Sequence, residues 1–241
     1  SILFISGIKM LGKEDTSVKG NFLSAMATLI AVSVRIINVV NIIIVIIGIG
    51  IGALIGSLIA LKVKMTSIPE MVALFNGFGG LATFFIAWSE FNAIPDNLFQ
   101  YVLIMLTTYI GGVTFSGSII AYGKLSEKLK IQKDSIITKL FTTLFYLSIL
   151  FLVYSTALTS FIEIPIDFYK VLLILTLLGG IGFVLPIGGG DMPVVISLLN
   201  SFSGIAAAFA GLLLLNNVLI VAGSLVGASG LILTVIMAKA M

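Results

Sequence analysis

The sequence predicts an all-α integral membrane protein, a polytopic bundle of about nine transmembrane helices in which the first is truncated. The first indication is composition: 59% of the 241 residues are hydrophobic, 10% are charged, and the mean hydropathy is +1.26. Soluble domains carry about 25% charged residues. The second indication is a series of long apolar segments, and the third is the placement of lysines between them.

Eight segments approach the roughly 20 apolar residues that are needed to cross a bilayer. They are predicted at residues 20–36, 39–61, 69–88, 98–122, 137–158, 168–187, 192–215 and 217–238. Residues 1–8 are apolar but only half a span long, without the basic start and small-residue cleavage site of a signal peptide. We interpret them as the inner half of a helix that begins outside this chain.

The basic residues gather between alternate helices. All of them except Arg35 and Lys170 lie in or directly beside one set of loops, namely 9–19, 62–68, 123–136 and the C-terminus. Lysine and arginine mark the cytoplasmic side of a membrane protein. Nine alternating helices therefore predict an N-terminus outside, a C-terminus inside, and the stretch from Gly188 to Asp191 at the inner end of the eighth helix.

Three predicted helices carry a stripe of small and polar residues. The stripes are Ala73, Asn76, Gly80 and Thr83; Thr107, Gly111, Thr114 and Ser118; and Ser197, Asn200, Ser201, Gly204, Ala208 and Gly211. Their spacing places each set on one helix face, which we expect to face inward because polar groups are costly against lipid. Two interpretations remain open: hydrogen bonds that hold the bundle together, or the lining of a hydrated path.

Glycines at intervals of four also mark the third and ninth predicted helices. The sets are Gly48, Gly52 and Gly56, and Gly223 and Gly227. Small residues at this spacing let membrane helices approach closely, so we interpret both sets as packing faces.

Asp191 stands between three glycines, Gly188, Gly189 and Gly190, and the proline of the next predicted helix. An aspartate there can cap the helix by accepting unpaired N–H groups. It can also act as a proton acceptor or gate beside a mobile joint, since glycines permit unusual backbone angles and ionisable groups in membrane segments are often functional. Glu70, in the first turn of the fourth helix, is interpreted as a partner of the helix dipole.

The chain lacks the residues that several kinds of chemistry require. It contains no cysteine and no histidine, which excludes disulfides, thiolate metal sites and the usual near-neutral proton switch. No G-x-G-x-x-G motif follows a strand, so the glycines at 188–190 are not a dinucleotide fingerprint. We therefore assign no catalytic, cofactor-binding or metal-binding residue.

Distinctive motifs run through the chain in order. They are SGIKMLGKEDTSVKGN, MTSIPEMVALFNGFGGLA, VTFSGSIIAYGKL, GDMPVVISLLNSFSGIAAAFAG and NNVLIVAGSLVGASGLILTVIMAKAM. They resemble the beta-subunit membrane domain of the proton-translocating nicotinamide nucleotide transhydrogenases. That family transfers hydride between NADH and NADP⁺ and couples the transfer to proton movement across the membrane.

The resemblance implies that residues 1–241 are a single transmembrane domain, the proton-channel part, and that the soluble NADP(H)-binding domain expected after it is absent. NAD(H) and NADP(H) would bind in partner domains and not in this segment. The implied partners are the alpha subunit with its NAD-binding domain and membrane helices, the NADP(H) domain, the bilayer and a second copy of the whole enzyme, with no nucleic acid. The implied location is a bacterial or mitochondrial inner membrane, with the lysine-rich loops on the cytoplasmic or matrix side.

The resemblance also implies roles for single residues. Asp191 matches an aspartate that communicates with the NADP(H) domain, and Asn200 and Ser118 match polar residues of the proton path. Gly117 and the glycines of the ninth helix, Gly223 and Gly227, match close helix contacts.

Asn76 stands where some members carry a histidine relay. In this chain the relay would therefore come from a partner, or run through water and carboxylates. The alternative function is an unrelated secondary transporter or ion channel subunit. The broken-looking stretch from Gly179 to Gly190 favours it mildly, although no inverted repeat is visible.

Overall fold

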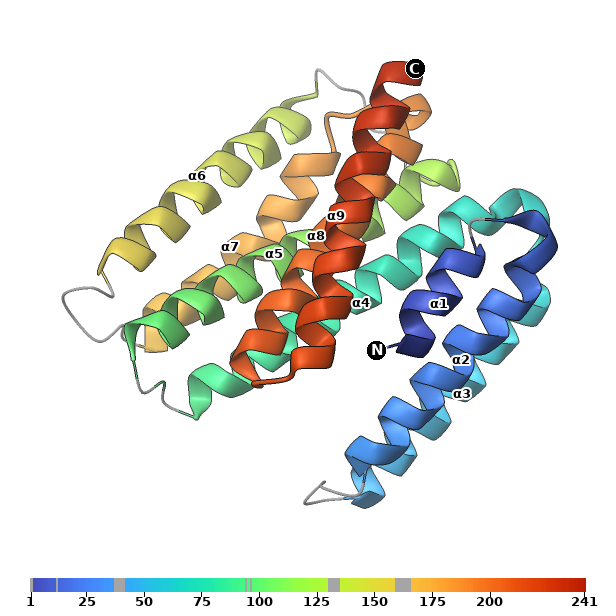
Figure 1. The fold of residues 1–241 in the computed structure, drawn as a ribbon. Coiled ribbons are helices and arrows are strands. Elements are labelled where there is room, and N and C mark those ends of the chain that lie inside the picture. Colours follow the sequence, from blue (N-terminus) through green and yellow to red (C-terminus); the bar gives the residue numbers. More distant parts are fainter. Residues whose placement is uncertain are drawn as a thin grey trace. The chain divides into compact units, whose positions relative to one another are not determined.

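The computed structural model describes residues 2–11, 13–36, 42–93, 95, 97–129, 135–158 and 166–241. The described residues form nine α-helices and no strand, which confirms the predicted all-α bundle (Figure 1). Two compact units divide the chain, Ser1–Lys64 and Met65–Met241. Seven of the described helices, α3 to α9, are long and apolar enough to cross a membrane.

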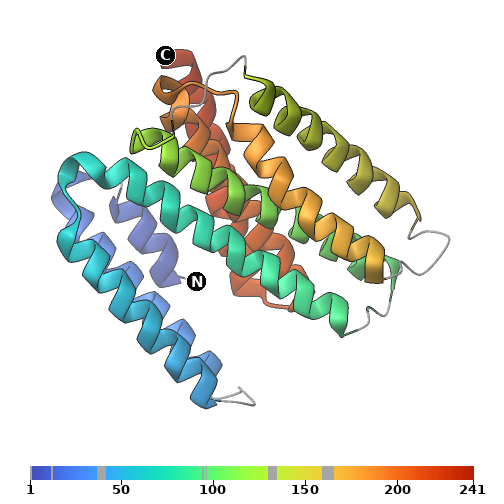
Figure 2. The ribbon, with the colours of Figure 1, turned by 180° about the vertical axis from the view of Figure 1, so that it is seen from behind.

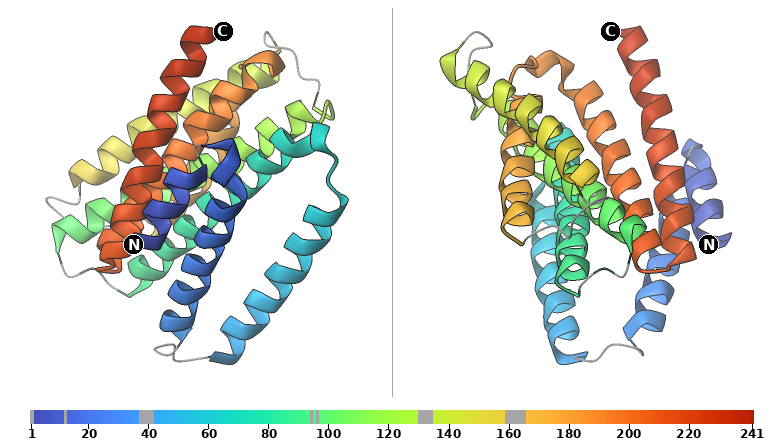
Figure 3. Two further views of the ribbon diagram at one scale, coloured as in Figure 1. Left: turned by 45° about the vertical axis from the view of Figure 1, so that its right-hand side comes forward. Right: turned by 90° about the vertical axis from the view of Figure 1, so that its left-hand side faces the viewer.

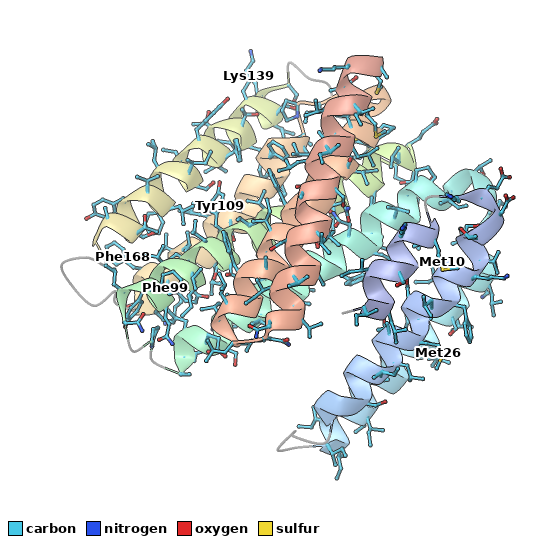
Figure 4. The ribbon with its side chains drawn as sticks, in the orientation of Figure 1. Met10, Met26, Phe99, Tyr109, Lys139 and Phe168 are labelled. Atoms are coloured by element: carbon cyan, nitrogen blue, oxygen red, sulfur yellow. The ribbon has the colours of Figure 1, made fainter. Side chains whose placement is uncertain are left out.

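The first unit holds α1 (Ile2–Leu11), α2 (Glu14–Ile36) and α3 (Ile42–Lys62). Helices α1 and α2 cross at two glycines: a Cβ on Gly20 would lie 2.8 Å from the Gly7 carbonyl oxygen. Figure 4 labels Met10 at the end of α1 and Met26 on α2. The glycines of α3 are predicted to form a packing face, but no described residue packs against them. A Cβ at Gly48, Gly52 or Gly56 would meet no atom within 4 Å.

The predicted loop at 9–19 is largely helical, because α2 begins at Glu14. Glu14 and Asp15 occupy its first turn, where the helix dipole favours carboxylates. The Thr16 hydroxyl closes the connection by donating to the Met10 carbonyl oxygen at 2.7 Å. Charged residues that suggest a loop in the sequence therefore start a helix.

The second unit begins with the 3₁₀ turn η1 (Met65–Ser67) and holds six long helices. In chain order they are α4 (Ile68–Asn92), α5 (Leu98–Leu125), α6 (Ile136–Leu158), α7 (Ile166–Val184), α8 (Met192–Leu213) and α9 (Asn217–Ala240). Helix α5 is central and packs against α4, α6, α7 and α8 (Figure 2). Helices α8 and α9 form a long antiparallel pair, and α6 lies beyond α7 on the side away from that pair (Figure 3).

The helices of the second unit alternate in direction. Helices α5, α7 and α9 end where α4, α6 and α8 begin (Figure 1), and we name this the lysine-rich end because it bears Lys124, Lys128, Lys139 and Lys239. Figure 4 shows Lys139 there and Phe99 and Phe168 at the opposite end. At that opposite end Phe91 stacks on Tyr169 with ring centroids 3.8 Å apart, which joins α4 to α7.

The turn between α8 and α9 is tight. Leu215 adopts a left-handed conformation with φ 50°, and the Asn216 N–H donates to the Gly211 carbonyl oxygen at 2.8 Å. The Asn216 side chain then caps α9 by accepting from the Leu219 N–H at 3.4 Å. The chain thus reverses within three residues, which places α9 directly along α8.

Candidate functional site

Helices α4 and α5 touch through glycine. A Cβ on Gly80 would lie 2.8 Å from the Gly111 carbonyl oxygen, and a Cβ on Gly111 would lie 2.8 Å from the Gly80 carbonyl oxygen. Three residues nearer the lysine-rich end, a Cβ on Gly77 would lie 3.0 Å from Ser118 Cβ. These contacts bring the two backbones close enough for short polar side chains to meet across them.

Asn76 and Ser118 meet at this interface. The Asn76 Nδ2 donates to Ser118 Oγ at 3.2 Å; Ser118 is buried and Asn76 is half-buried. At a rise of about 1.5 Å per residue, both lie about 10–12 Å from the lysine-rich ends of their helices. The structure therefore brings together two of the four polar residues that the sequence suggests for a proton path.

Most other buried hydroxyls have partners on their own helix. Thr107, Thr114 and Ser116 of α5 donate to the carbonyl oxygens four residues earlier, at 2.7, 2.6 and 3.0 Å. The hydroxyls of Tyr109 and Ser148 lie 3.0 Å apart, which joins α5 to α6 (Figure 4). These groups satisfy the backbone or hold helices together, which is the packing interpretation of the polar stripes.

The serines of α8 hold α9. Ser197 donates to the Gly230 carbonyl oxygen at 3.2 Å, and Ser201 donates to the Gly227 carbonyl oxygen at 2.6 Å. The predicted packing glycines lie at the same interface: a Cβ on Gly223 would lie 2.5 Å from the Ala208 nitrogen, and a Cβ on Gly227 would lie 3.1 Å from Ile205. This part of the α8 stripe is a helix contact.

Asn200 departs from its stripe, because its side chain is exposed and does not face inward with Ser197 and Ser201. A step of three residues turns a helix by about 300°, so Asn200 falls at the edge of the buried face. Ser203 Oγ would lie 3.0 Å from a Cβ on Gly79 of α4, and α4 and α8 begin at the same end. Asn200 is three residues before Ser203, and Asn76 is three residues before Gly79. The two asparagines therefore lie at the same depth in the bundle, about one helical turn nearer the lysine-rich end.

The stretch before α8 also differs from expectation. None of the described glycines has a positive φ, and Gly188 is extended with φ −68° and ψ 156°. The next three residues form the 3₁₀ turn η2 (Gly189–Asp191), and a Cβ at Gly189 or Gly190 would meet nothing within 4 Å. We call Gly188–Asp191 the joint. Its glycines leave open space around the chain without using backbone angles that exclude other residues.

Asp191 precedes α8 but does not cap it. Its side chain is exposed and makes no cap hydrogen bond. Capping is therefore not what the structure shows for this carboxylate. Glu70 lies in the first turn of α4 at the same end, as expected for a partner of the helix dipole.

Gly117 lies where three helices meet. A Cβ there would lie 3.1 Å from Val184 of α7, 3.3 Å from Leu199 of α8 and 3.4 Å from the Gly180 carbonyl oxygen. A side chain at this position would press on Val184 and Leu199, which belong to the helices on either side of the joint, and these two side chains would have to give by a few tenths of an ångström.

Lys124 was not singled out by the sequence. Its ammonium group donates to the carbonyl oxygens of Leu185 and Ile187, each at 2.5 Å, and of Val184 at 3.4 Å. A cavity of about 160 Å³ adjoins it, lined by Lys124, Leu129, Leu185, Pro186, Ile187, Gly188 and Gly189. The available signal was a lysine within the last turn of an apolar helix, six residues after Ser118.

The described residues offer no metal centre. No group of three or more Asp, Glu, His or Cys side chains is placed to hold an ion. The described part of the chain also has no strand from which a dinucleotide-binding βαβ unit could be built. The site contains the hydrogen-bonded pair of half-buried Asn76 and buried Ser118, an exposed carboxylate at a helix end, and an amide at the level of the pair.

Long apolar helices packed through glycine, with hydrogen-bonded polar groups inside, define a polytopic integral membrane protein. The family model of the NAD(P) transhydrogenase beta subunit matches residues 1–241, and the chain belongs to that family. It is similar to NAD(P) transhydrogenase subunit beta of Rhodospirillum rubrum, at 36% identity over 256 aligned residues. A second sequence with that name, from a defined strain of the same bacterium, matches equally. The alignment covers all of this chain and 53% of each relative, so the chain spans about half of their length.

Proposed function

We propose that this chain is the membrane domain through which protons cross while hydride passes from NADH to NADP⁺, giving NAD⁺ and NADPH, in partner soluble domains. Family membership supports the reaction class. The observation that carries the proposal is the Asn76–Ser118 hydrogen bond, a side-chain pair between two helices at the level of a third polar residue, Asn200. The hydroxyls of Thr107, Thr114 and Ser116, which donate to carbonyl oxygens of α5 itself, do not connect two helices in this way.

The proposed path begins at the lysine-rich end. Asp191 exchanges a proton there, since its carboxylate is exposed and unbonded. Asn76, Ser118 and Asn200 then hold water molecules in line about a third of the way across the membrane. An amide and a hydroxyl donate and accept hydrogen bonds but carry no charge near neutral pH. In this proposal they therefore orient the water molecules that carry the proton, and they do not bind the proton themselves.

The storage group must come from elsewhere. The chain has no histidine, and every described Asp, Glu, Lys and Arg residue lies within about two turns of a helix end or in a connection. We propose that a partner helix of the alpha subunit covers exposed Asn200 and supplies the relay, or that water connects the pair to Asp191. Such a cover also removes an exposed amide from lipid, where unsatisfied polar groups are costly.

The other parts of the proposal follow from the same arrangement. The alpha subunit contributes the NAD-binding domain, and an NADP(H)-binding domain acts on the joint at Gly188, Gly189 and Gly190. Gly117, Gly223 and Gly227 keep the helices close. The whole enzyme is proposed as a homodimer in a bacterial or mitochondrial inner membrane, with its lysine-rich loops on the cytoplasmic or matrix side.

The test compares two serines on the same helix. Ser118 and Ser116 are both buried, but Ser118 accepts from Asn76 whereas Ser116 donates only to Gly112 of its own helix. In the assembled enzyme in vesicles, Ser118→Ala and Asn76→Leu are expected to lower proton uptake about tenfold, as loss of about 1.4 kcal/mol from a rate-limiting step would. Ser116→Ala serves as the matched control and should pump normally.

Two outcomes would contradict the proposal. Hydride transfer by the wild-type enzyme without proton movement would contradict the function. Equal pumping by Ser118→Ala and Ser116→Ala would remove the Asn76–Ser118 pair from the path.

A further inference from the structure

One side chain ties the end of α5 to the start of the joint. The Lys124 ammonium group donates hydrogen bonds to the carbonyl oxygens of Leu185 and Ile187, two residues that follow the end of α7. Carbonyl groups at a helix C-terminus lack intrahelical partners and favour a cation. Among the described residues no carboxylate lies within 4.0 Å of this ammonium group. Among the described residues, carbonyl oxygens are therefore the partners of this charge.

This contact lies directly before the joint. Ile187 directly precedes Gly188, whereas Gly189 and Gly190 have open space around them and Asp191 is exposed. On the other side, Lys124 shares α5 with Ser118, about 9 Å away along the helix axis. Among the described residues, Lys124 therefore makes a polar contact between α5, which carries Ser118, and the segment that leads to Asp191.

We propose that Lys124 is a positioning residue, which holds the joint in register with α5 so that a displacement of the joint reaches Ser118. The inference rests on the proposed function, because it gives this contact a part in coupling nucleotide state to the proton path. A lysine that merely caps α7 would stabilise the protein without making the joint respond to nucleotide. The two roles therefore differ in a measurable way.

The chain contains no cysteine, so a single reporter thiol can be introduced. Gly190→Cys is suitable because a Cβ there meets nothing within 4 Å. In the complete enzyme, the rate of maleimide labelling at this position is measured with and without NADP(H), and the labelled peptide is identified by mass spectrometry. Proton uptake is measured on matching preparations that carry the same Lys124 substitutions but lack the Gly190→Cys reporter.

In the complete enzyme, where we propose that the NADP(H)-binding domain acts on the joint and covers it, Lys124→Met is expected to raise the labelling rate about tenfold, equivalent to about 1.4 kcal/mol in the opening equilibrium, and to abolish its response to NADP(H). Coupled proton uptake should fall with it. Lys124→Arg retains a charged donor and should restore both the response and most of the uptake. Lys128→Met is the matched control: Lys128 is an exposed lysine beyond the same helix end and should change neither readout.

A second variant guards against misfolding. In Lys124→Ala, methylammonium in the buffer can enter the cavity beside the vacated carbonyl oxygens, and it should restore slow, nucleotide-dependent labelling when sodium chloride at equal concentration does not. If both Lys124→Met and Lys124→Ala fail to assemble, the ammonium group is a structural requirement and the positioning role is overturned.

The remaining outcomes separate this inference from the proposed function. Unchanged labelling in Lys124→Met overturns the inference. Faster labelling with a normal nucleotide response and normal proton uptake also overturns it, and leaves the proposed function standing. Hydride transfer without proton uptake in the wild-type enzyme overturns the proposed function and this inference with it.

Discussion

Replacing Gly111 with alanine is expected to open the contact between α4 and α5 without replacing a polar side chain. The new Cβ would lie 2.8 Å from the Gly80 carbonyl oxygen, 2.8 Å from Thr83 Oγ1 and 2.9 Å from the Phe84 nitrogen. Ordinary contact begins at 3.4 Å. Since two of the three atoms belong to the backbone, no rotamer change relieves the clash, and α4 must move away by about 0.6 Å.

That displacement acts directly on the buried pair. The Asn76–Ser118 distance of 3.2 Å would lengthen to about 3.8 Å, beyond the range in which a side-chain hydrogen bond persists. Overpacking costs about 1–3 kcal/mol, and the better helix propensity of alanine offsets about 1 kcal/mol of it. We therefore expect a modest loss of stability, below about 2 kcal/mol, together with a loss of proton uptake of about tenfold.

The assay is proton uptake by vesicles that contain the assembled enzyme, accompanied by thermal unfolding in detergent. Gly50→Ala on α3 is the matched control, because its Cβ meets nothing within 4 Å and the substitution is chemically identical. It should retain full uptake. Equal uptake by the Gly111→Ala and Gly50→Ala enzymes would refute the reasoning that the α4–α5 separation governs the pair.

Three further outcomes are expected. Ser201→Ala removes the 2.6 Å bond to Gly227 and should lower the unfolding free energy by roughly 0.6–1 kcal/mol while pumping stays normal; a pumping defect in a stable variant would place Ser201 in the path. Leu215→Gly relieves a left-handed leucine whose side chain is 88% exposed, and should raise the unfolding temperature by about 2–4 °C in a calorimetric scan, whereas no change would mean that the turn is unstrained. Cysteines replacing Lys128 and Lys170 should react with impermeant reagents from opposite sides of the membrane, with Lys128→Cys on the cytoplasmic or matrix side; reaction from one side would contradict the topology.

The helices were predictable because each depends on local composition. A long apolar run satisfies its backbone groups within a membrane by forming a helix, so α3 to α9 match seven of the eight predicted spans closely. The predicted span at 20–36 lies within α2, which is helical but is not among the described helices long and apolar enough to cross a membrane. The sequence places the start of α2 too late, because Glu14 and Asp15 resemble a loop although they suit a helix N-terminus. Charge alone does not separate these two cases.

The site was less predictable because it depends on packing between helices. Spacing places Asn200 with Ser197 and Ser201, but only the position of α9 decides that the two serines are buried and Asn200 is not. The sequence alone groups Lys124 with the loop lysines, since nothing local indicates that the end of α7 passes its side chain. The pairing of Asn76 with Ser118 likewise requires the crossing at Gly80 and Gly111, residues far apart in the chain.

The most direct test of the central claim is proton uptake by vesicles containing Asp191→Asn, measured beside Asp191→Ala, with assembly of both verified. Asparagine caps helices about as well as aspartate, and the Asp191 side chain makes no cap hydrogen bond in the structure. Both variants should therefore assemble with wild-type stability and lose most proton-linked transhydrogenation, because neither can carry the proton. Near-normal pumping by the Asp191→Asn enzyme would contradict the claim that this carboxylate couples the proton path to the nucleotide domains.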